Sequence, residues 1–204
     1  MPMHEFFTIQ TATGWGRTLQ AFADWCDPQP GWATLDAGCG PGLLPALLAQ
    51  RGCRATGVDL DSGAVSPARL HPSLAVADVR RLPFAPGSFQ LITASNLLFL
   101  LTSPLEALEE MVRLLAPDGQ VAVLNPSEQM SVQAVQALVE ARGLQGVARD
   151  SLLNWAERAE AHARWDEQDL RALFSAAGLQ LADTCLRLGP GLARFAKGTL
   201  NERA

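Results

Sequence analysis

The stretch Leu35-Asp36-Ala37-Gly38-Cys39-Gly40-Pro41-Gly42 predicts the end of a buried strand, a glycine turn and the start of a helix over 43–50. Glycine adopts the positive φ angles of such a turn and lets the backbone come close to a bound small molecule. Asp36 stands immediately before the turn, and no Lys or Arg occurs between it and Arg51. Because this arrangement repels a diphosphate and attracts an ammonium or sulfonium group, it predicts a cationic ligand.

The composition is that of a globular protein. The 204 residues, of which 48% are hydrophobic and 18% charged, fit one domain of ordinary size. No apolar run reaches the roughly 18 residues of a membrane helix, and residues 1–10 lack the basic and apolar regions of a secretory signal. We therefore expect a cytoplasmic protein without a membrane partner. The net charge of −5 also disfavours nucleic acid as a partner.

The cysteines and the single lysine limit the chemistry that is available to the chain. Cys26, Cys39, Cys53 and Cys185 have neither C-x-x-C nor Cys/His ligand spacing, so we expect no metal site and no disulfide framework. Lys197 is the single lysine and leaves one candidate for Schiff-base formation.

From Trp32 onward, short apolar runs alternate with helical segments, which indicates a parallel sheet built from strand–helix–strand units. The expected strands are 33–36, 54–59, 73–77, 89–94 and 120–124, and the expected helices between them are 43–50, 62–70 and 104–115. Asp118-Gly119 is a turn signal that starts the fifth strand. Two later apolar segments, 179–188 and 192–199, predict an antiparallel hairpin at the sheet edge.

Two segments outside this alternation are expected to border the ligand. A helix over about 16–25 follows Trp15, and this region either folds over the ligand or packs on the sheet edge. Residues 127–166 carry two helical patterns, 131–141 and 151–163, after the end of a strand. Because ligands bind at that end of an open parallel sheet, we expect this segment to form a lid.

Acidic residues end three successive predicted strands, namely Asp36, Asp59 and Asp78. The carboxyl ends of parallel strands meet at one edge of a sheet, so the three carboxylates are expected at one crevice. For one aspartate alone, a cap or turn role is the more frequent explanation. The repeated position favours a ligand site, in which Asp59 accepts hydrogen bonds from ribose hydroxyls and Asp78 from the amine of adenine.

The motifs LDAGCGPG, GVDLD, VADVRRLPFAPGSFQLI, SNLLFLL and LAPDGQVAVLN, in this order, resemble those of the class I S-adenosylmethionine-dependent methyltransferases that act on small molecules. The resemblance covers 32–126. It implies an α/β fold: a Rossmann-like, doubly wound seven-stranded sheet, mostly parallel, with an antiparallel C-terminal edge hairpin and helices on both faces. The expected single domain, 1–204, then consists of an N-terminal flap or helix (1–31), a cofactor-binding core (32–126), a helical lid (127–166) and a C-terminal helix and hairpin (167–204).

The resemblance also assigns residues to S-adenosylmethionine, whose product is S-adenosylhomocysteine. Asp36 is expected near the methionine amino group, Gly38 and Gly40 beneath the methionine moiety, and Asn96 at its border.

On the adenosine side, the resemblance places Asp59 at the ribose and Leu60 against the adenine. Asp78 would hold the adenine amine, and the Val79 backbone amide would bind a ring nitrogen. One departure affects the substrate side: Phe99-Leu100 stands where a pair of histidines is frequent.

The implied reaction is direct in-line displacement at the sulfonium methyl, in which alignment and desolvation supply most of the acceleration without a metal. His162 is the candidate general base, although an exposed position on a helix is the more frequent role for such a histidine. The candidate substrate-pocket residues, each of which has a core role as its alternative, are Trp15, Phe99, Trp155 and Trp165. Arg164 is either a partner for an acidic substrate or a surface charge.

Three functions therefore stay open. The first is methyl transfer to a small, apolar metabolite, and the second is binding of S-adenosylmethionine without catalysis. The third, an NAD-dependent oxidoreductase, is disfavoured by Asp36. The identity of the acceptor, its reacting atom and the oligomeric state are not encoded in any motif of the chain.

Overall fold

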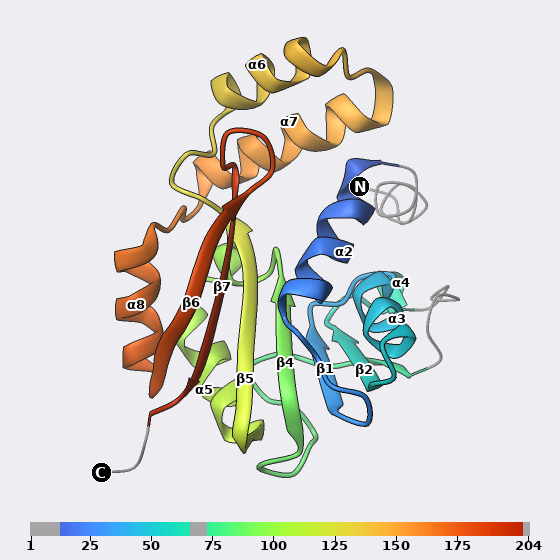
Figure 1. The fold of residues 1–204 in the computed structure, drawn as a ribbon, viewed down its shortest axis with the longest axis vertical. Helices are drawn as coiled ribbons and strands as arrows, with labels where there is room; N and C mark the ends of the chain where they lie inside the picture. The colour runs from blue at the N-terminus through green and yellow to red at the C-terminus, as the bar shows by residue number, and fades with distance from the viewer. Residues whose placement is uncertain (1–12, 66–72, 202–204) are drawn as a thin grey trace.

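The computed structural model describes residues 13–65 and 73–201, which form a seven-stranded sheet in the order β3-β2-β1-β4-β5-β7-β6 (Figure 1). β1 pairs in parallel with β2 and β4, and the parallel pairing continues from β2 to β3 and from β4 to β5. β7 is antiparallel to both β5 and β6. The strands are β1 (Ala33–Ala37), β2 (Arg54–Asp59), β3 (Leu74–Val76), β4 (Phe89–Ser95), β5 (Leu115–Pro126), β6 (Leu179–Arg187) and β7 (Ala193–Leu200).

Helices cover both faces of this sheet, which confirms the predicted Rossmann-like fold. One core contains residues of α2 (Gly14–Trp25) and α3 (Leu43–Gln50), and the other contains residues of α5 (Pro104–Leu114) and α8 (Glu167–Ala176). The remaining helices are α4 (Ser62–Val65), the 3-10 helix η1 (Leu98–Leu100), α6 (Val132–Arg142) and α7 (Gly146–Ala161). Of the helix predicted over 62–70, the part beyond α4 lies outside the described residues.

The central strands are buried on both sides because each contributes to both cores. In β4, Leu91 belongs to the core beneath α2 and α3, whereas Ile92 belongs to the core beneath α5 and α8. Continuous apolar runs of this kind are typical of parallel strands covered on both faces. They explain why the alternation of apolar runs and helical segments predicted the sheet.

The start of β5 differs from the prediction. The strand begins at Leu115 rather than at residue 120, and its pairing with β4 passes from Phe89↔Leu115 to Leu91↔Gln120. The β5 side therefore holds more residues than the β4 side, and the predicted turn at 118–119 lies in this bulge. A bulge accommodates Pro and Gly within a strand, so these residues did not end it.

The start of α7 also differs from the prediction, since the helix begins at Gly146 and not at Ser151. Its N-cap residue, Gln145, makes no capping hydrogen bond through its side chain. Ser151, which resembles a capping residue in the sequence, instead donates a hydrogen bond to the backbone oxygen of Ala148 inside the helix. The true start thus carries no sequence signal of the usual kind.

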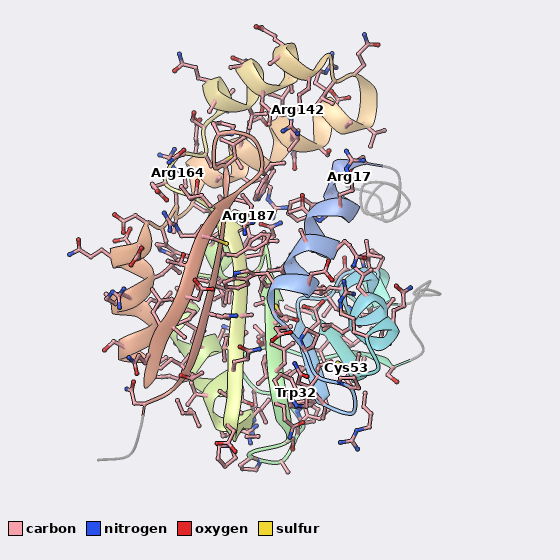
Figure 2. The ribbon with its side chains drawn as sticks, in the orientation of Figure 1. Arg17, Trp32, Cys53, Arg142, Arg164 and Arg187 are labelled. Atoms are coloured by element: carbon pink, nitrogen blue, oxygen red, sulfur yellow. The ribbon has the colours of Figure 1, made fainter. Side chains whose placement is uncertain are left out.

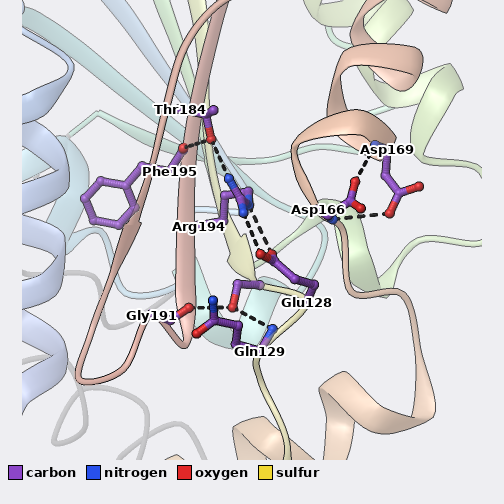
Figure 3. Close-up of polar contacts among 9 residues, drawn as sticks. Glu128, Gln129, Asp166, Asp169, Thr184, Gly191, Arg194 and Phe195 are labelled. Carbon is purple, nitrogen blue, oxygen red and sulfur yellow. Dashed lines mark hydrogen bonds and ion pairs between the residues drawn. The ribbon is translucent and has the colours of Figure 1, made fainter.

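The segment that carries α6 and α7 leaves the sheet after β5 and lies over one end of it (Figure 1). Polar contacts fix its first residues to the β6–β7 hairpin (Figure 3). Glu128 accepts hydrogen bonds from Arg194 Nη2 at 2.7 Å and Nε at 3.2 Å, and Arg194 Nη1 donates to Thr184 Oγ1 at 3.1 Å. Ser127 donates to the backbone oxygen of Gly191 at 2.5 Å.

The same serine closes the base of the segment. Ser127 forms a parallel bridge with Trp165, so the two ends of the helical segment meet beside the sheet. The next helix, α8, then begins with a capping box between Asp166 and Asp169 (Figure 3). The α6–α7 pair is therefore held at both ends by hydrogen bonds to the sheet domain.

We predict that Glu128→Ala lowers the free energy of unfolding by about 2–4 kcal/mol, measured by urea denaturation, because it leaves a buried arginine without its charge partner. The Arg194 side chain is only 8% exposed. The control is Asp150→Ala, which removes the exposed ion pair with Arg149 and should change the stability by less than about 0.5 kcal/mol. Equal losses in the two variants would contradict the anchoring role of Glu128.

Candidate functional site

The strand order reverses at β1, because β2 and β3 lie on one side of β1, and β4 and β5 lie on the other. In open α/β sheets, ligands bind beyond the carboxyl ends of the strands at such a point. A cavity of about 340 Å³ opens there. The predicted site residues that line its strand end are Asp36, Gly38, Gly40, Asp59 and Asn96.

The glycine turn is held against the sheet. Gly38 has a φ of +72° and donates its backbone N–H to Val58 at 2.8 Å. A Cβ atom at Gly38 would lie 3.0 Å from the Leu97 side chain, so a larger residue would strain both the backbone and the packing. Gly42, with a φ of +86°, then forms the N-cap of α3. At Gly38 and Gly40, the wall of the cavity therefore consists of backbone atoms without side chains.

Asp59 supports the turn while keeping capacity for a ligand. Its Oδ2 accepts the backbone N–H of Gly40 at 2.8 Å, and its Oδ1 accepts that of Asp61 at 3.0 Å. Each carboxylate oxygen has two lone pairs, so one on each oxygen is left for a further donor. A vicinal diol such as that of ribose matches two neighbouring acceptors.

Asp36 is the buried charge of the site, with only 2% of its surface exposed. Thr93 donates a hydrogen bond from Oγ1 to Asp36 Oδ1 at 2.8 Å. Burial raises the pKa of Asp36 to about 8, against the lowering effect of the Thr93 hydrogen bond, and the charge of Asp59 raises it further. A carboxylate in this position favours a cationic ligand group, which would replace the missing solvation.

Asn96 adds an acceptor to the same end of the cavity. It adopts a φ of +54°, and its backbone N–H donates to Leu124 at 2.7 Å. The side-chain Oδ1 atom is buried and has no hydrogen-bond partner among the described residues. Buried polar atoms in folded proteins are normally satisfied, so this atom is a candidate acceptor for a further donor.

The opposite end of the cavity is aromatic and belongs to helices. Trp15 of α2 and Trp155 of α7 pack edge to face with ring centroids 5.1 Å apart, and Phe99 of η1 lines the same wall. These three are predicted substrate-pocket residues. α2 and α7, which are far apart in the sequence, therefore meet over the cavity.

Several lining residues were missed by the sequence analysis. Ala148, Ser151, Leu152 and Arg158 line the cavity from α7, beside the predicted Trp155 of the same helix. Their spacings of three and four residues place them on one face of the helix. This pattern is visible in the sequence, but it does not by itself distinguish a cavity wall from a core face. Arg158 is the one basic residue among the described residues that line the cavity.

Three residues assigned to adenine do not line the cavity. Leu60 is 67% exposed, and Val79 is buried in the core beneath α5 and α8. Asp78 forms an ion pair with Arg80 at 2.7 Å, and the hydrogen bond from Arg80 holds the pKa of Asp78 at about 2.

His162 and Trp165 also lie apart from the cavity lining. His162 is the exposed C-cap residue of α7, and its ring centroid is 6.3 Å from that of Phe99. Trp165 packs against both cores and bridges Ser127. Arg164 donates to the backbone oxygen of Met130 at 2.6 Å.

The part of the chain that the structure describes contains no group of three or more His, Cys, Asp or Glu side chains placed to hold a metal ion. Within the same ranges, no helix has the length and apolarity needed to cross a bilayer.

Residues 35–123, which include the turn, all three carboxylates and Asn96, match the family described as Methyltransferase domain. Over these residues, the chain is similar to the class I S-adenosylmethionine-dependent methyltransferases. Curated relatives of this methyltransferase domain include the ubiquinone biosynthesis O-methyltransferase of Pseudomonas paraeruginosa, 34% identical over 109 residues. That alignment covers 48% of this chain and 47% of the relative.

A second relative is the 2-phytyl-1,4-naphtoquinone methyltransferase of Thermosynechococcus vestitus, 33% identical over 134 residues. The alignment covers 61% of this chain and 60% of the relative. The chain thus spans about half the length of the first curated relatives that it matches.

Solved structures share the fold of the methyltransferase domain over nearly its whole length. The magnesium protoporphyrin IX methyltransferase of Synechocystis PCC 6803, with bound S-adenosylhomocysteine, has a TM-score of 0.67 and 18% identity. It covers 92% of this chain and 84% of the other. The TehB-like methyltransferase of Corynebacterium glutamicum has a TM-score of 0.66 and 19% identity, over 98% of this chain and 100% of the other.

We predict that the pKa of Asp36 makes the empty domain less stable as the pH rises. Between its ordinary pKa of 3.8 and its folded value of about 8, the folded state holds a proton that the unfolded state releases. The free energy of unfolding therefore falls through this window and levels off above pH 8. Asp36→Asn should remove this decline, so its stability advantage over the wild type should grow from pH 5 to pH 8 in urea denaturation.

The matched control is Asp118→Asn, an exposed aspartate in the β5 bulge, which should follow the wild-type pH trend. A constant difference between Asp36→Asn and the wild type across this pH range would contradict the assignment.

Proposed function

We propose that this chain transfers the methyl group of S-adenosylmethionine to a small, largely apolar acceptor by direct in-line displacement, without a metal ion. The observation that carries the proposal is the cavity of about 340 Å³, which has carboxylates at its strand end and aromatic side chains at its helical end. The names of the two curated relatives, both quinone-related methyltransferases, support an aromatic acceptor of this kind.

The strand end suits the cofactor. Asp36 and Asn96 would hold the ammonium group of the methionine moiety, and the bare backbone at Gly38 leaves room beneath it. Asp59, which already accepts two backbone N–H groups, would bind the ribose hydroxyls with its remaining lone pairs. When bound, the sulfonium supplies a methyl group that is already activated for displacement.

The helical end suits the acceptor. Trp15, Phe99 and Trp155 present apolar surface, which orients a flat acceptor and excludes water from the reacting atoms. Trp15 and Trp155 come from α2 and α7, so these two helices would serve as the flap and lid predicted for 1–31 and 127–166. The rings of these two residues are in contact, with centroids 5.1 Å apart.

The charged side chains among the described lining residues determine how the acceptor loses its proton. They are Asp36, Asp59 and Arg158. Both carboxylates are engaged at the cofactor end, and His162 does not line the cavity. The acceptor would therefore react as an anion, which the positive charge of Arg158 favours by lowering the pKa of the acceptor.

We predict that Asp59→Ala weakens binding of S-adenosylhomocysteine by at least about 10- to 100-fold in isothermal titration calorimetry, because even one hydrogen bond to a charged group contributes roughly 1.5–3 kcal/mol. Asp118→Ala, at an exposed aspartate in β5, is the control and should leave the affinity unchanged. Unaltered binding in Asp59→Ala would contradict the assigned site.

Activity is tested by release of S-adenosylhomocysteine from S-adenosylmethionine over a panel of phenols, quinols, amines and thiols. Turnover that persists in EDTA supports metal-independent transfer. Cofactor binding with no turnover on the panel would favour a non-catalytic binding protein, and a thermal shift with NAD but none with S-adenosylmethionine would favour an oxidoreductase.

We predict that Arg158→Gln raises the midpoint of the kcat–pH profile by about one unit for an ionisable acceptor identified in that panel, because a neighbouring opposite charge lowers a pKa by about 1–3 units. The KM for S-adenosylmethionine should stay unchanged. A uniform loss of kcat without a shift of the midpoint would show that Arg158 acts only in packing.

A further inference from the structure

A second cleft, of about 180 Å³, adjoins the cavity and is lined by three arginines. Arg17 comes from α2, Arg142 is the last residue of α6, and Arg187 is the last residue of β6. Figure 2 labels Arg17, Arg142 and Arg187 around the place where α2, the helical segment and the β6–β7 turn approach one another. The side chains are exposed, so the cleft is open to solvent.

The charge of this cleft is unbalanced. No Asp or Glu is among the described residues that line it, and no ion pair of Arg17, Arg142 or Arg187 occurs within 13–65 and 73–201. Guanidinium groups stay protonated at all ordinary pH values. Three positive charges around one small cleft, on a chain with a net charge of −5, attract an anion and repel one another without it.

Local contacts hold one of these side chains, Arg187, against the wall. Arg187 donates to the backbone oxygen of Leu186 at 3.1 Å, and its Cζ lies 6.0 Å from the centroid of the Phe195 ring. These contacts use few of the five N–H donors on its guanidinium. The remaining donors suit the planar oxygens of a carboxylate or a phosphate.

The cleft and the cavity adjoin each other. Gly14, Thr18 and Leu188 line both of them, so the arginines lie next to the cavity. Arg164, by contrast, is bonded to Met130 and lines neither space.

We propose that the cleft lined by Arg17, Arg142 and Arg187 binds an anionic group, a carboxylate or a phosphate, at the end of the methyl acceptor that lies away from the reacting atom. This inference rests on the proposed function, and it defines the acceptor further as an apolar molecule with a charged terminus. The arginines would select such molecules over neutral analogues of the same shape.

The test uses the full chain saturated with S-adenosylhomocysteine and a series of probes from phenylacetate to 6-phenylhexanoate, each paired with its uncharged amide. In calorimetry, the best acid should bind at least tenfold more tightly than its amide. Arg17→Gln, Arg142→Gln and Arg187→Gln should each reduce this ratio several-fold, and a rise in salt from 50 to 500 mM should weaken the acids only. Arg149→Gln, at an exposed arginine of α7 paired with Asp150, is the control and should retain the ratio.

Equal binding of acids and amides, no binding of either, or an acid preference that survives in all three arginine variants would overturn the inference. Inorganic phosphate is the probe for a free anion: binding as tight as that of the best acid would place a free ion, not an acceptor, in the cleft and would also overturn it. Binding of S-adenosylhomocysteine is measured in every variant. If the wild type does not bind S-adenosylhomocysteine, the proposed function is wrong. If it binds S-adenosylhomocysteine but does not prefer acids, only this inference is wrong.

Discussion

The burial of the Asp36 carboxylate at the end of β1 is the constraint on which the site depends. The residue lies in the middle of the sheet, next to the reversal point, and has one side-chain donor, Thr93. A buried charge without a charge partner is unfavourable by several kcal/mol, so the empty site favours the protonated acid. A cationic ligand restores the ionised form and releases that proton. Occupancy of the cavity and protonation of Asp36 are therefore opposing equilibria.

The sheet order explains why the other polar groups gather around this carboxylate. β2 and β4 flank β1, so Asp59 and Asn96 emerge at the same edge, while the glycine turn leads from β1 into α3. None of these positions depends on the helical segment. The strand end of the cavity is thus built from the sheet, and its helical end is built from helices that come from distant parts of the chain.

Much of this arrangement could be predicted from the sequence because it depends on local signals. Apolar runs marked the strands, and Asp36, Asp59 and Asn96 follow three of them directly. The starts of β5 and α7 could not be predicted in the same way. In β5, pairing with β4 tolerates the Pro and Gly that resemble a turn, and α7 begins without a capping side chain.

The other features that could not be predicted from the sequence depend on tertiary contacts. Asp78 carries the same strand-end signal as Asp59, yet Arg80, two residues later, engages its carboxylate. Arg17, Arg142 and Arg187 lie on three separate elements, and only folding brings them to one cleft. Likewise, the contact of Trp15 with Trp155 joins α2 to α7, and no spacing along the chain indicates it.

The closed base of the α6–α7 segment has a consequence for how such proteins diversify. Because Ser127 meets Trp165 and Glu128 is tied to Arg194, an insertion, deletion or exchange of helices between these points does not alter the path of the sheet. The helices over the cavity can therefore be replaced as a unit while the strand end of the cavity is kept unchanged. The Ser127–Trp165 and Glu128–Arg194 contacts mark the positions at which helical segments from related proteins could be grafted to create new acceptor preferences.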